Sequence, residues 1–194
     1  MLSLILNRIL GKWGTMGKEL YQQRNKEKAK YVELQAWMPR YGSSNHGQDA
    51  LGYVVDKKPN LVVDFGCGRN NFIEALKTEG VKGVGVDFVY QEADIVAPMH
   101  EIPLEDDSVD FITAFDSLEH LLTEDVDLVL EEMKRIATPQ ADFCFSISYE
   151  PSNILVHNEN LHPTIKSECW WKGKLKTIGD TSSMGKYLIG TFKI

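Results

Sequence analysis

Short apolar runs alternate with amphipathic, helix-like stretches between residues 61 and 150. The apolar runs predict strands at about 61–65, 83–87, 93–96, 109–115 and 142–148. Helices are predicted at about 70–79 and 123–137, the second starting near Thr123 and stopping before Pro139. Two further runs, at 175–178 and 187–194, indicate a closing strand pair. Alternating strands and helices are typical of an α/β fold built on a parallel sheet.

The first sixty residues have a different, mostly helical pattern. Apolar residues from Leu2 to Trp13 recur with the spacing of one helix face, and a second helix is predicted at about 18–37 after Gly11, Gly14 and Gly17. The first helix is expected to pack on the domain or to form a homodimer, with binding to a membrane surface as the alternative. Residues 41–47 form a glycine-flanked loop in which Tyr41 and His46 either close a site or make a surface turn.

Composition favours one compact domain, with residues 1–60 as a helical extension and residues 61–194 as the α/β domain. The 194 residues are 43% hydrophobic, which suffices for one core. No apolar run approaches the roughly 18 residues of a membrane span, and the run from Leu2 to Leu6 is too short for a secretory signal. The three scattered cysteines indicate reduced thiols and a cytoplasmic protein.

A glycine-rich turn follows the first predicted strand. Gly66 and Gly68 let the backbone turn tightly and approach a ligand closely. Asp87 ends the next predicted strand, where its carboxylate can accept hydrogen bonds from both hydroxyls of a ribose. Because such corners of α/β sheets bind nucleotides, the pattern predicts a nucleoside-type ligand.

The segment Val62-Val63-Asp64-Phe65-Gly66-Cys67-Gly68-Arg69-Asn70, together with Asp87, resembles motif I and the acidic loop of class I S-adenosylmethionine-dependent methyltransferases. An acid at Asp64 suits a ligand with an ammonium and a sulfonium better than a pyrophosphate. Asn70 stands where the family usually has a third glycine, and Asn tolerates the left-handed backbone best after glycine. The resemblance implies a doubly wound, Rossmann-like sheet of seven strands with helices on both faces and the last strand antiparallel.

The resemblance also implies a set of contacts to S-adenosylmethionine. Met99 would offer its backbone N–H to the adenine, Phe88 would pack against the adenine or ribose or else belong to the core, and Cys67 would contribute backbone. The implied cofactor residues are Asp64, Gly66, Cys67, Gly68, Asp87, Phe88, Met99 and Phe115.

The segment Asp116-Ser117-Leu118-Glu119-His120-Leu121 resembles the acceptor side of many small-molecule methyltransferases. There a histidine faces the acceptor, so His120 is the expected general base, with Asp116 beside it; the alternative is a histidine that packs on the next helix. His162, in a His-Pro-Thr segment similar to those of compact and phage methyltransferase-like proteins, is a second candidate imidazole. Of Trp170 and Trp171, which follow it, one is expected to pack inward.

Asp116, Glu119 and His120 also resemble the group that binds a divalent ion in some ubiquinone-type and small-RNA 2′-O-methyltransferases. A fourth ligand would come from His157 or His162. Two carboxylates with an imidazole suit Mg²⁺ or Mn²⁺, which would polarise a hydroxyl pair on the acceptor.

The net charge of −7 is unevenly distributed. Residues 1–60 carry ten Lys and Arg against five Asp and Glu, residues 61–150 five against twenty, and residues 151–194 six against three. Basic flanks favour a small, possibly anionic, acceptor, unless their charges are only solvated surface. We therefore predict O- or N-methyl transfer to such a molecule. A nucleic-acid methyltransferase is the second hypothesis, although the chain lacks the Asn/Asp-Pro-Pro-aromatic and Pro-Cys motifs of DNA enzymes. A non-catalytic cofactor-binding module is the third.

Overall fold

The computed structural model describes residues 15–43 and 46–193 of a chain that falls into two compact units, 1–39 and 40–194. In the first unit the described residues form helix α2 (Thr15–Trp37), which confirms the second predicted helix. Gly17 lies inside this helix and does not interrupt it. The helix predicted between Leu2 and Trp13, and the homodimer contact assigned to it, lie outside the described residues. Over the described ranges, no helix is long and apolar enough to cross a membrane.

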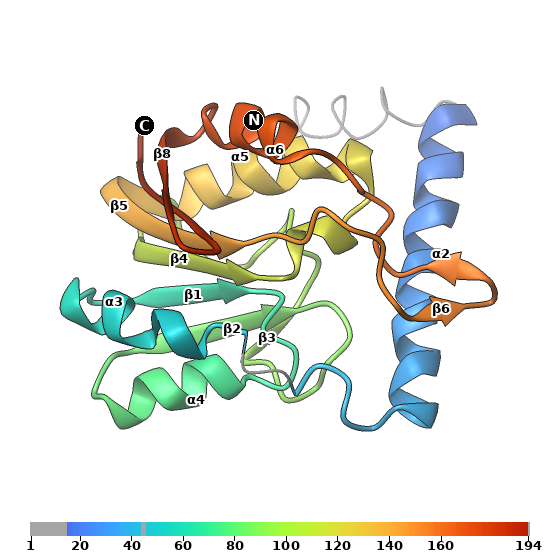
Figure 1. Cartoon of the computed structure of the whole chain (residues 1–194), viewed down its shortest axis with the longest axis horizontal. Helices are drawn as coiled ribbons and strands as arrows, with labels where there is room; N and C mark the ends of the chain where they lie inside the picture. The colour runs from blue at the N-terminus through green and yellow to red at the C-terminus, as the bar shows by residue number, and fades with distance from the viewer. Residues whose placement is uncertain (1–14, 44–45, 194) are drawn as a thin grey trace. The chain divides into compact units, whose positions relative to one another are not determined.

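A seven-stranded sheet forms the centre of the second unit, with the strand order β3-β2-β1-β4-β5-β9-β8 (Figure 1). Strands β1 to β5 pair in parallel, whereas β9 is antiparallel to both of its neighbours, β5 and β8. The predicted doubly wound sheet with an antiparallel last strand is confirmed. Its strands are β1 (Val62–Phe65), β2 (Gly83–Asp87), β3 (Ile95–Val96), β4 (Val109–Phe115), β5 (Ala137–Ser146), β8 (Gly179–Met184) and β9 (Tyr187–Phe192).

Helices cover both faces of this sheet. Figure 1 shows α3 (Leu51–Asp56) and α4 (Asn71–Thr78) on one side, and α5 (Val126–Ile136) and α6 (Glu168–Leu175) on the other. Two apolar clusters follow from this arrangement, one of them on the α5 side with Trp171 fully buried in it. The shorter elements are η1 (Gln48–Ala50), η2 (Leu118–His120), η3 (Thr123–Asp125) and a hairpin of β6 (Leu155–Val156) with β7 (Glu159–Asn160).

The predicted boundary between the second core helix and strand five is wrong. Helix α5 ends at Ile136 and the chain passes directly into β5, so Pro139 lies inside the strand. Pairing with β4 shifts register between Ala137 and Asp142, and Gln140 has a φ of 76° within this irregular stretch. A bulge tolerates proline because no ladder hydrogen bond is needed from its nitrogen.

The first strand of the predicted closing pair is also wrong. Residues 175–178 end α6 and the turn after it, and the strand starts at Gly179. Strand β8 has the sequence Gly-Asp-Thr-Ser-Ser-Met and lies at the edge of the sheet. An edge strand with largely polar side chains has no apolar pattern by which sequence could locate it.

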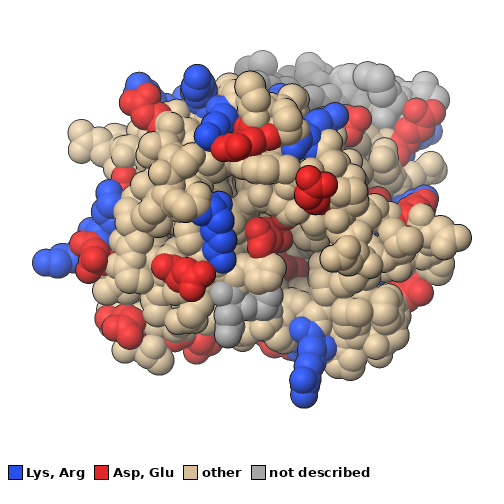
Figure 2. All heavy atoms as spheres, in the orientation of Figure 1, with Lys and Arg blue, Asp and Glu red and all other residues tan. Residues whose placement is uncertain are grey.

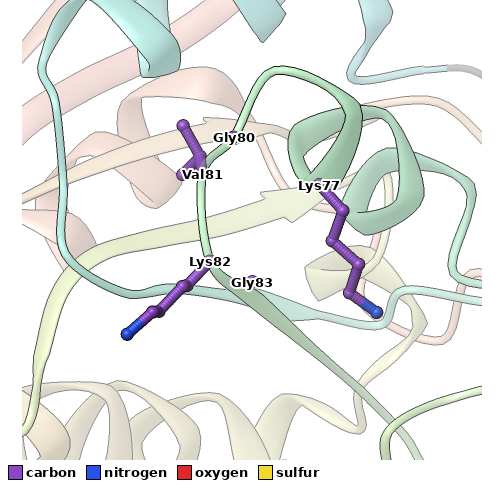
Figure 3. Close-up of a pocket in the computed structure, with 5 residues that line it drawn as sticks. All are labelled: Lys77, Gly80, Val81, Lys82 and Gly83. Atoms are coloured by element: carbon purple, nitrogen blue, oxygen red, sulfur yellow. The ribbon is translucent and has the colours of Figure 1, made fainter.

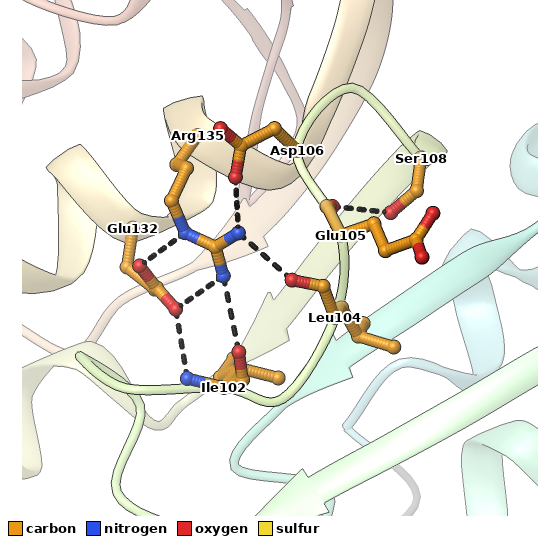
Figure 4. Close-up of polar contacts among 7 residues, drawn as sticks. All are labelled: Ile102, Leu104, Glu105, Asp106, Ser108, Glu132 and Arg135. Carbon is orange, nitrogen blue, oxygen red and sulfur yellow. Dashed lines mark hydrogen bonds and ion pairs between the residues drawn. The ribbon is translucent and has the colours of Figure 1, made fainter. Parts of the chain in front are cut away.

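The loop between β3 and β4 is held against α5 by Arg135 (Figure 4). The guanidinium of Arg135 donates to both carboxylate oxygens of Glu132 at 2.7 and 2.8 Å, and to the carbonyl oxygens of Ile102 and Leu104 at 3.0 and 2.8 Å. It also pairs with Asp106 at 2.6 Å. Glu132 in turn accepts the Ile102 N–H at 2.7 Å. The planar guanidinium, with its fixed fork of donors, therefore determines the path of this loop.

We expect Arg135→Lys to destabilise the second unit by about 1–3 kcal/mol, because an ammonium cannot reproduce the several directed bonds and leaves buried acceptors unmatched. Urea unfolding followed by circular dichroism measures this change. Glu131→Ala, at an exposed position on the same helix, serves as the control and should stay within about 0.5 kcal/mol of wild type. Equal stabilities of Arg135→Lys and wild type would contradict this role for Arg135.

Candidate active site

The turn after β1 is closed so tightly that only glycine fits at two of its positions. Gly66 and Gly68 have φ values of 77° and 53°. A Cβ on Gly66 would lie 2.5 Å from the Ser117 Cβ and 2.8 Å from the Met99 Cε, and a Cβ on Gly68 would lie 2.5 Å from the Gly42 carbonyl oxygen. The segments that contain Gly42, Met99 and Ser117 therefore meet at this turn. The turn follows β1, where the order of the parallel strands reverses, and this is the position at which open α/β sheets bind ligands.

Asn70 takes the place of a glycine in this turn. Its φ of 66° is left-handed, so the prediction of an intact turn with asparagine at this position is confirmed. The Asn70 Nδ2 donates to Asp94 Oδ2 at 2.9 Å, and the same oxygen accepts the Gly85 N–H at 2.9 Å. A Cβ on Gly85 would lie 1.9 Å from Asn70 Oδ1. A glycine in β2 thus makes room for the side chain that replaces the third turn glycine.

Asp87 ends β2 with its carboxylate facing the same turn. Its Oδ1 accepts the N–H groups of Val89 and Tyr90 at 2.8 and 3.1 Å, and its Oδ2 accepts the Gly68 N–H at 3.2 Å. Burial raises the pKa of Asp87, whereas these backbone donors favour the ionised form. Oδ2 has further acceptor capacity toward a hydroxyl, since a carboxylate oxygen accepts more than one hydrogen bond.

Asp64 is buried beneath the turn within β1. Thr113 Oγ1, on the neighbouring strand β4, donates to Asp64 Oδ1 at 2.7 Å. Burial raises the pKa of Asp64 to about 7, with a further rise from Asp87 and an opposing effect of the Thr113 hydroxyl. Near neutral pH, Asp64 is therefore divided between its protonated and ionised forms, and a nearby cation would favour the ionised form.

Residues 41–43 pack on the glycine turn. The Arg69 N–H donates to the Gly42 carbonyl at 3.0 Å, and the Tyr90 hydroxyl donates to the Tyr41 carbonyl at 2.9 Å. Gly42 has a φ of 75°, and a Cβ there would lie 2.6 Å from the Tyr90 ring. Residues 41–43 thus cover the turn, in agreement with the closing role weighed for this loop.

Tyr41 connects the two halves of the site electrostatically. Burial raises the pKa of its phenol, and the neighbouring groups Tyr90, Glu119 and Asp87 raise it further. The ring is therefore neutral and lies within electrostatic reach of the acid at the end of β2 and of an acid that follows β4. The sequence pattern alone did not place Tyr41 between them.

The remaining predicted cofactor residues surround the same turn. Met99 is largely buried, with its Cε against Gly66, and Phe88 is half-buried after β2. Phe115 at the end of β4 packs edge to face on Phe72, with ring centroids 4.8 Å apart. Burial raises the pKa of the Cys67 thiol, which agrees with its expected role as a small residue rather than a nucleophile.

Asp116 follows β4 and contacts a histidine from a distant part of the chain. The His46 Nδ1 contacts Asp116 Oδ2, and Asp116 Oδ1 accepts from Ser146 Oγ at 2.8 Å. Asp116 has a φ of 47°, which is uncommon for a residue other than glycine and holds its carboxylate toward His46. From the sequence, His46 was expected either to close a site or to make a surface turn, because nothing local links positions 46 and 116.

Glu119, His120 and His162 form a cluster in which one ligand atom from each lies within 4.8 Å of the others; we call this the Glu-His-His cluster. His120 Nδ1 lies 2.8 Å from the Leu161 carbonyl and His162 Nδ1 lies 2.7 Å from the Glu150 carbonyl. Because a carbonyl only accepts, both Nδ1 atoms carry the proton. In the neutral rings, Nε2 is then the nitrogen with the lone pair.

Burial favours the uncharged forms of Glu119 and His120 in this cluster. Burial raises the pKa of Glu119 to about 8; the Glu119 and Ser148 backbone N–H groups oppose the rise, and Asp116 adds to it. Burial, followed by His162, lowers the pKa of His120 to about 4. Glu119 Oε1 accepts the Ser148 N–H at 2.9 Å, whereas the buried Oε2 has no hydrogen-bond partner in the structure. In the neutral acid, Oε2 carries the proton and can donate it to a ligand, whereas a cation bound there would favour the ionised form.

The metal-ligand set predicted from sequence differs from this cluster. Asp116 lies outside it, because its carboxylate contacts His46 and Ser146. His162 takes the place of Asp116, while His157 is exposed at the tip of the β6–β7 hairpin. His120 and His162 meet edge to face, with ring centroids 4.6 Å apart.

The His-Pro-Thr segment is fixed to the turn that carries His120. The Thr164 N–H donates to the Glu119 carbonyl at 3.2 Å, and its hydroxyl donates to the Leu121 carbonyl at 2.7 Å. Thr164 is fully buried. Trp171 packs into the core while Trp170 is half-buried, which confirms the expectation that one of the two tryptophans points inward.

A shallow depression of about 320 Å³ lies at the other end of the sheet, lined by Lys77, Gly80, Val81, Lys82 and Gly83 (Figure 3). These residues precede or begin β2, so they lie at its amino end, away from Asp87. The side chains of Lys77 and Lys82 point in different directions in Figure 3 and do not converge on a common point. We do not assign the depression to the site.

Sequence reasoning missed Ser117 and Thr113. The Ser117 hydroxyl donates to the Phe65 carbonyl at 2.8 Å and so joins the end of β1 to the segment after β4. Both residues are buried polar side chains whose partners lie about fifty positions away. Their only local signal is a hydroxyl in or beside an otherwise apolar strand.

Comparison with known proteins agrees with this geometry. Residues 34–171 match the profile of a family described as a methyltransferase domain. No curated protein matches the chain. Solved structures with a similar fold include the PH0226 protein of Pyrococcus horikoshii OT3, with a TM-score of 0.62, 18% identity, and coverage of 82% of this chain and 96% of that one.

A second similar structure is the 1,6-didemethyltoxoflavin-N1-methyltransferase of Burkholderia thailandensis, bound to 1,6-didemethyltoxoflavin and S-adenosylhomocysteine. Its TM-score is 0.63 at 15% identity, over 89% of this chain and 88% of that one. An S-adenosylmethionine-dependent methyltransferase from Archaeoglobus fulgidus has a TM-score of 0.56 at 21% identity, with coverage of 70% of this chain and 68% of that one. Because the family profile spans well over half of the sequence and the fold is similar to that of these solved structures, the chain belongs to the methyltransferase domain family and has the class I S-adenosylmethionine-dependent methyltransferase fold.

Proposed function

We propose that this enzyme transfers a methyl group from S-adenosylmethionine to an oxygen or nitrogen atom of a small acceptor. The observation that carries the proposal is the contact of Ser117 with Gly66 and Phe65. It joins the glycine turn, which would hold the cofactor, to the segment that carries Asp116 and His120. Methyl transfer requires donor and acceptor in line at short range, and this arrangement brings their two sites next to each other.

The cofactor would be held by the residues around the glycine turn. Asp87 would accept from the ribose hydroxyls, Met99 and Phe88 would border the adenine, and Asp64 would face the positively charged methionine part. Gly66, Cys67, Gly68 and Phe115 would contribute backbone or a wall of the pocket. S-adenosylmethionine supplies the activated methyl group, and the protein supplies position, charge and exclusion of water.

One similar structure supports a small acceptor. The Burkholderia thailandensis enzyme holds 1,6-didemethyltoxoflavin, so a similar fold accommodates a small molecule. The distribution of charged side chains gives less support to an anionic acceptor. Among the lysines of residues 151–194, four form ion pairs with acids, namely Lys172, Lys174, Lys186 and Lys193. The face in Figure 2 shows acidic and basic side chains interspersed. We therefore favour a small acceptor over a nucleic acid.

A divalent ion, Mg²⁺ or Mn²⁺, is a second candidate feature of the acceptor side. The Glu-His-His cluster has donor atoms that suit such an ion. Both imidazoles direct Nδ1–H to a backbone carbonyl, so the lone pair is on Nε2, and Glu119 Oε2 has no hydrogen-bond partner. A bound ion would polarise an acceptor hydroxyl. With or without an ion, the side chains of the Glu-His-His cluster would position the acceptor.

We expect Asp87→Asn to weaken S-adenosylhomocysteine binding by about 1.5–3 kcal/mol, since charge-assisted bonds to the ribose are lost while the side-chain shape is kept. Titration calorimetry measures this affinity. Glu79→Gln, which changes an exposed acid at the end of α4, should bind as wild type does. If Asp87→Asn also binds with wild-type affinity, the ribose assignment is wrong.

We expect cofactor binding near pH 6 to release protons, because the ligand's positive charge would lower the pKa of Asp64 from about 7. Affinity should therefore rise with pH below about 7 and level off above it. Calorimetry in two buffers of different ionisation enthalpy counts the released protons. Asp64→Asn should release fewer protons, and S-adenosylhomocysteine, which lacks the sulfonium, should release fewer than S-adenosylmethionine. Equal release by wild type and Asp64→Asn would exclude Asp64 as the source.

A labelled-methyl screen tests the activity itself. We expect transfer to at least one member of a panel of small phenols, catechols, amines and heterocycles, and no transfer to RNA or duplex DNA. Each reaction is run with chelator alone and with added Mg²⁺ or Mn²⁺. Transfer that depends on the added ion supports the ion at the Glu-His-His cluster, and transfer indifferent to chelator excludes it. Exclusive labelling of nucleic acid would overturn the small-acceptor proposal, and labelling of nothing would favour a binding module.

A further inference from the structure

We infer that His46 is the general base that accepts the acceptor's proton, and that Asp116 is the residue that positions it. This inference rests on the proposed function. The starting observation is the contact of His46 Nδ1 with Asp116 Oδ2. A carboxylate is an acceptor, so Nδ1 carries the proton and Nε2 of the neutral ring has the lone pair. A base held in one tautomer by an acid is the arrangement that activates nucleophiles in many enzymes.

Asp116 is itself held in place from two sides. Its Oδ1 accepts from Ser146 Oγ at 2.8 Å, and its backbone N–H donates to the Ser146 carbonyl at 2.9 Å. Its left-handed backbone, with φ at 47°, costs free energy that the surrounding contacts must offset. Strain of this kind occurs where a side chain must point in one direction, and here that direction is toward His46.

His46 is fixed through its backbone. The Tyr187 hydroxyl, on β9, donates to the His46 carbonyl at 2.9 Å. At the next position, a Cβ on Gly47 would lie 2.4 Å from the Phe115 ring and 2.8 Å from the Phe72 ring. Glycine therefore lets the loop approach the end of β4 closely enough for His46 to reach Asp116.

The pair lies in the same space as the other candidate groups. Asp116 and His120 lie four residues apart in the segment after β4, and His46 contacts Asp116, so the pair lies beside the segment that carries His120. His120 is half-buried, and burial lowers its pKa to about 4, so it is a weak base. The His46 side chain is 50% exposed. Access and orientation together favour His46 over His120 as the proton acceptor.

The chemical step then balances as follows. The acceptor O–H or N–H transfers its proton to His46 Nε2, while its oxygen or nitrogen forms a bond to the methyl carbon. The sulfur–carbon bond breaks and its electron pair stays on sulfur, which gives S-adenosylhomocysteine. The imidazolium of His46 is stabilised by the Asp116 carboxylate and returns its proton to water before the next turnover.

The first test uses the panel compound with the highest wild-type rate. His46→Ala should lower kcat by about 10²–10⁴-fold and leave the affinity for S-adenosylhomocysteine unchanged. Because the site of His46 is half exposed, added imidazole should restore part of the rate. Imidazole should not raise the rate of Asp87→Asn, which serves as the matched control. Asp116→Asn should lower kcat similarly, since an amide can hold the wrong tautomer. A wild-type kcat in His46→Ala, or loss of rate without rescue, would overturn the inference.

A second measurement needs no acceptor. The ring ¹⁵N spectrum of the wild-type protein should show His46 as the Nδ1–H tautomer, and Asp116→Asn should change it. A wild-type Nε2–H tautomer would overturn the inference, whatever the screen finds. Absence of transfer by the wild type would instead count against the proposed function, so the two failures are distinguishable.

Discussion

Because Gly66 has no side chain, Ser117 can approach the end of β1 and donate its hydroxyl to the Phe65 carbonyl. This buried hydrogen bond joins two strands beyond the point where their ladder ends. It determines how far Asp116 and the Glu-His-His cluster lie from the glycine turn. A Cβ at position 66 would collide with both Ser117 and Met99, so the contacts of these two residues with the turn require glycine at this position.

Much of the fold could be predicted from the sequence because its central strands are buried on both faces. Strands β2 and β4 have the bounds that their apolar runs indicate. The prediction failed where tertiary context outweighs local pattern. Pro139 lies in a bulge of β5, and the polar strand β8 forms by pairing with β9 at the edge of the sheet.

The glycine turn was more predictable than the contacts after β4 for a related reason. Gly66, Gly68 and Asp87 lie on consecutive elements, so the distance along the sequence translates into a distance in space. Contacts of His46 with Asp116, and of His162 with His120, join segments 70 and about 40 residues apart. No local periodicity encodes them, since loop conformation brings them together.

The segment between β5 and Thr164 is fixed at its end, next to His120, whereas its middle forms a separate hairpin. The bonds of Thr164 to Glu119 and Leu121 hold its last residues, while the β6–β7 hairpin lies outside the main sheet. Lengthening a loop whose ends are fixed costs little conformational entropy. Evolution can therefore alter the hairpin, in length or in sequence, without moving His120. Under the proposed function, insertions or deletions in the hairpin would change acceptor preference while the glycine turn and the sheet stay the same.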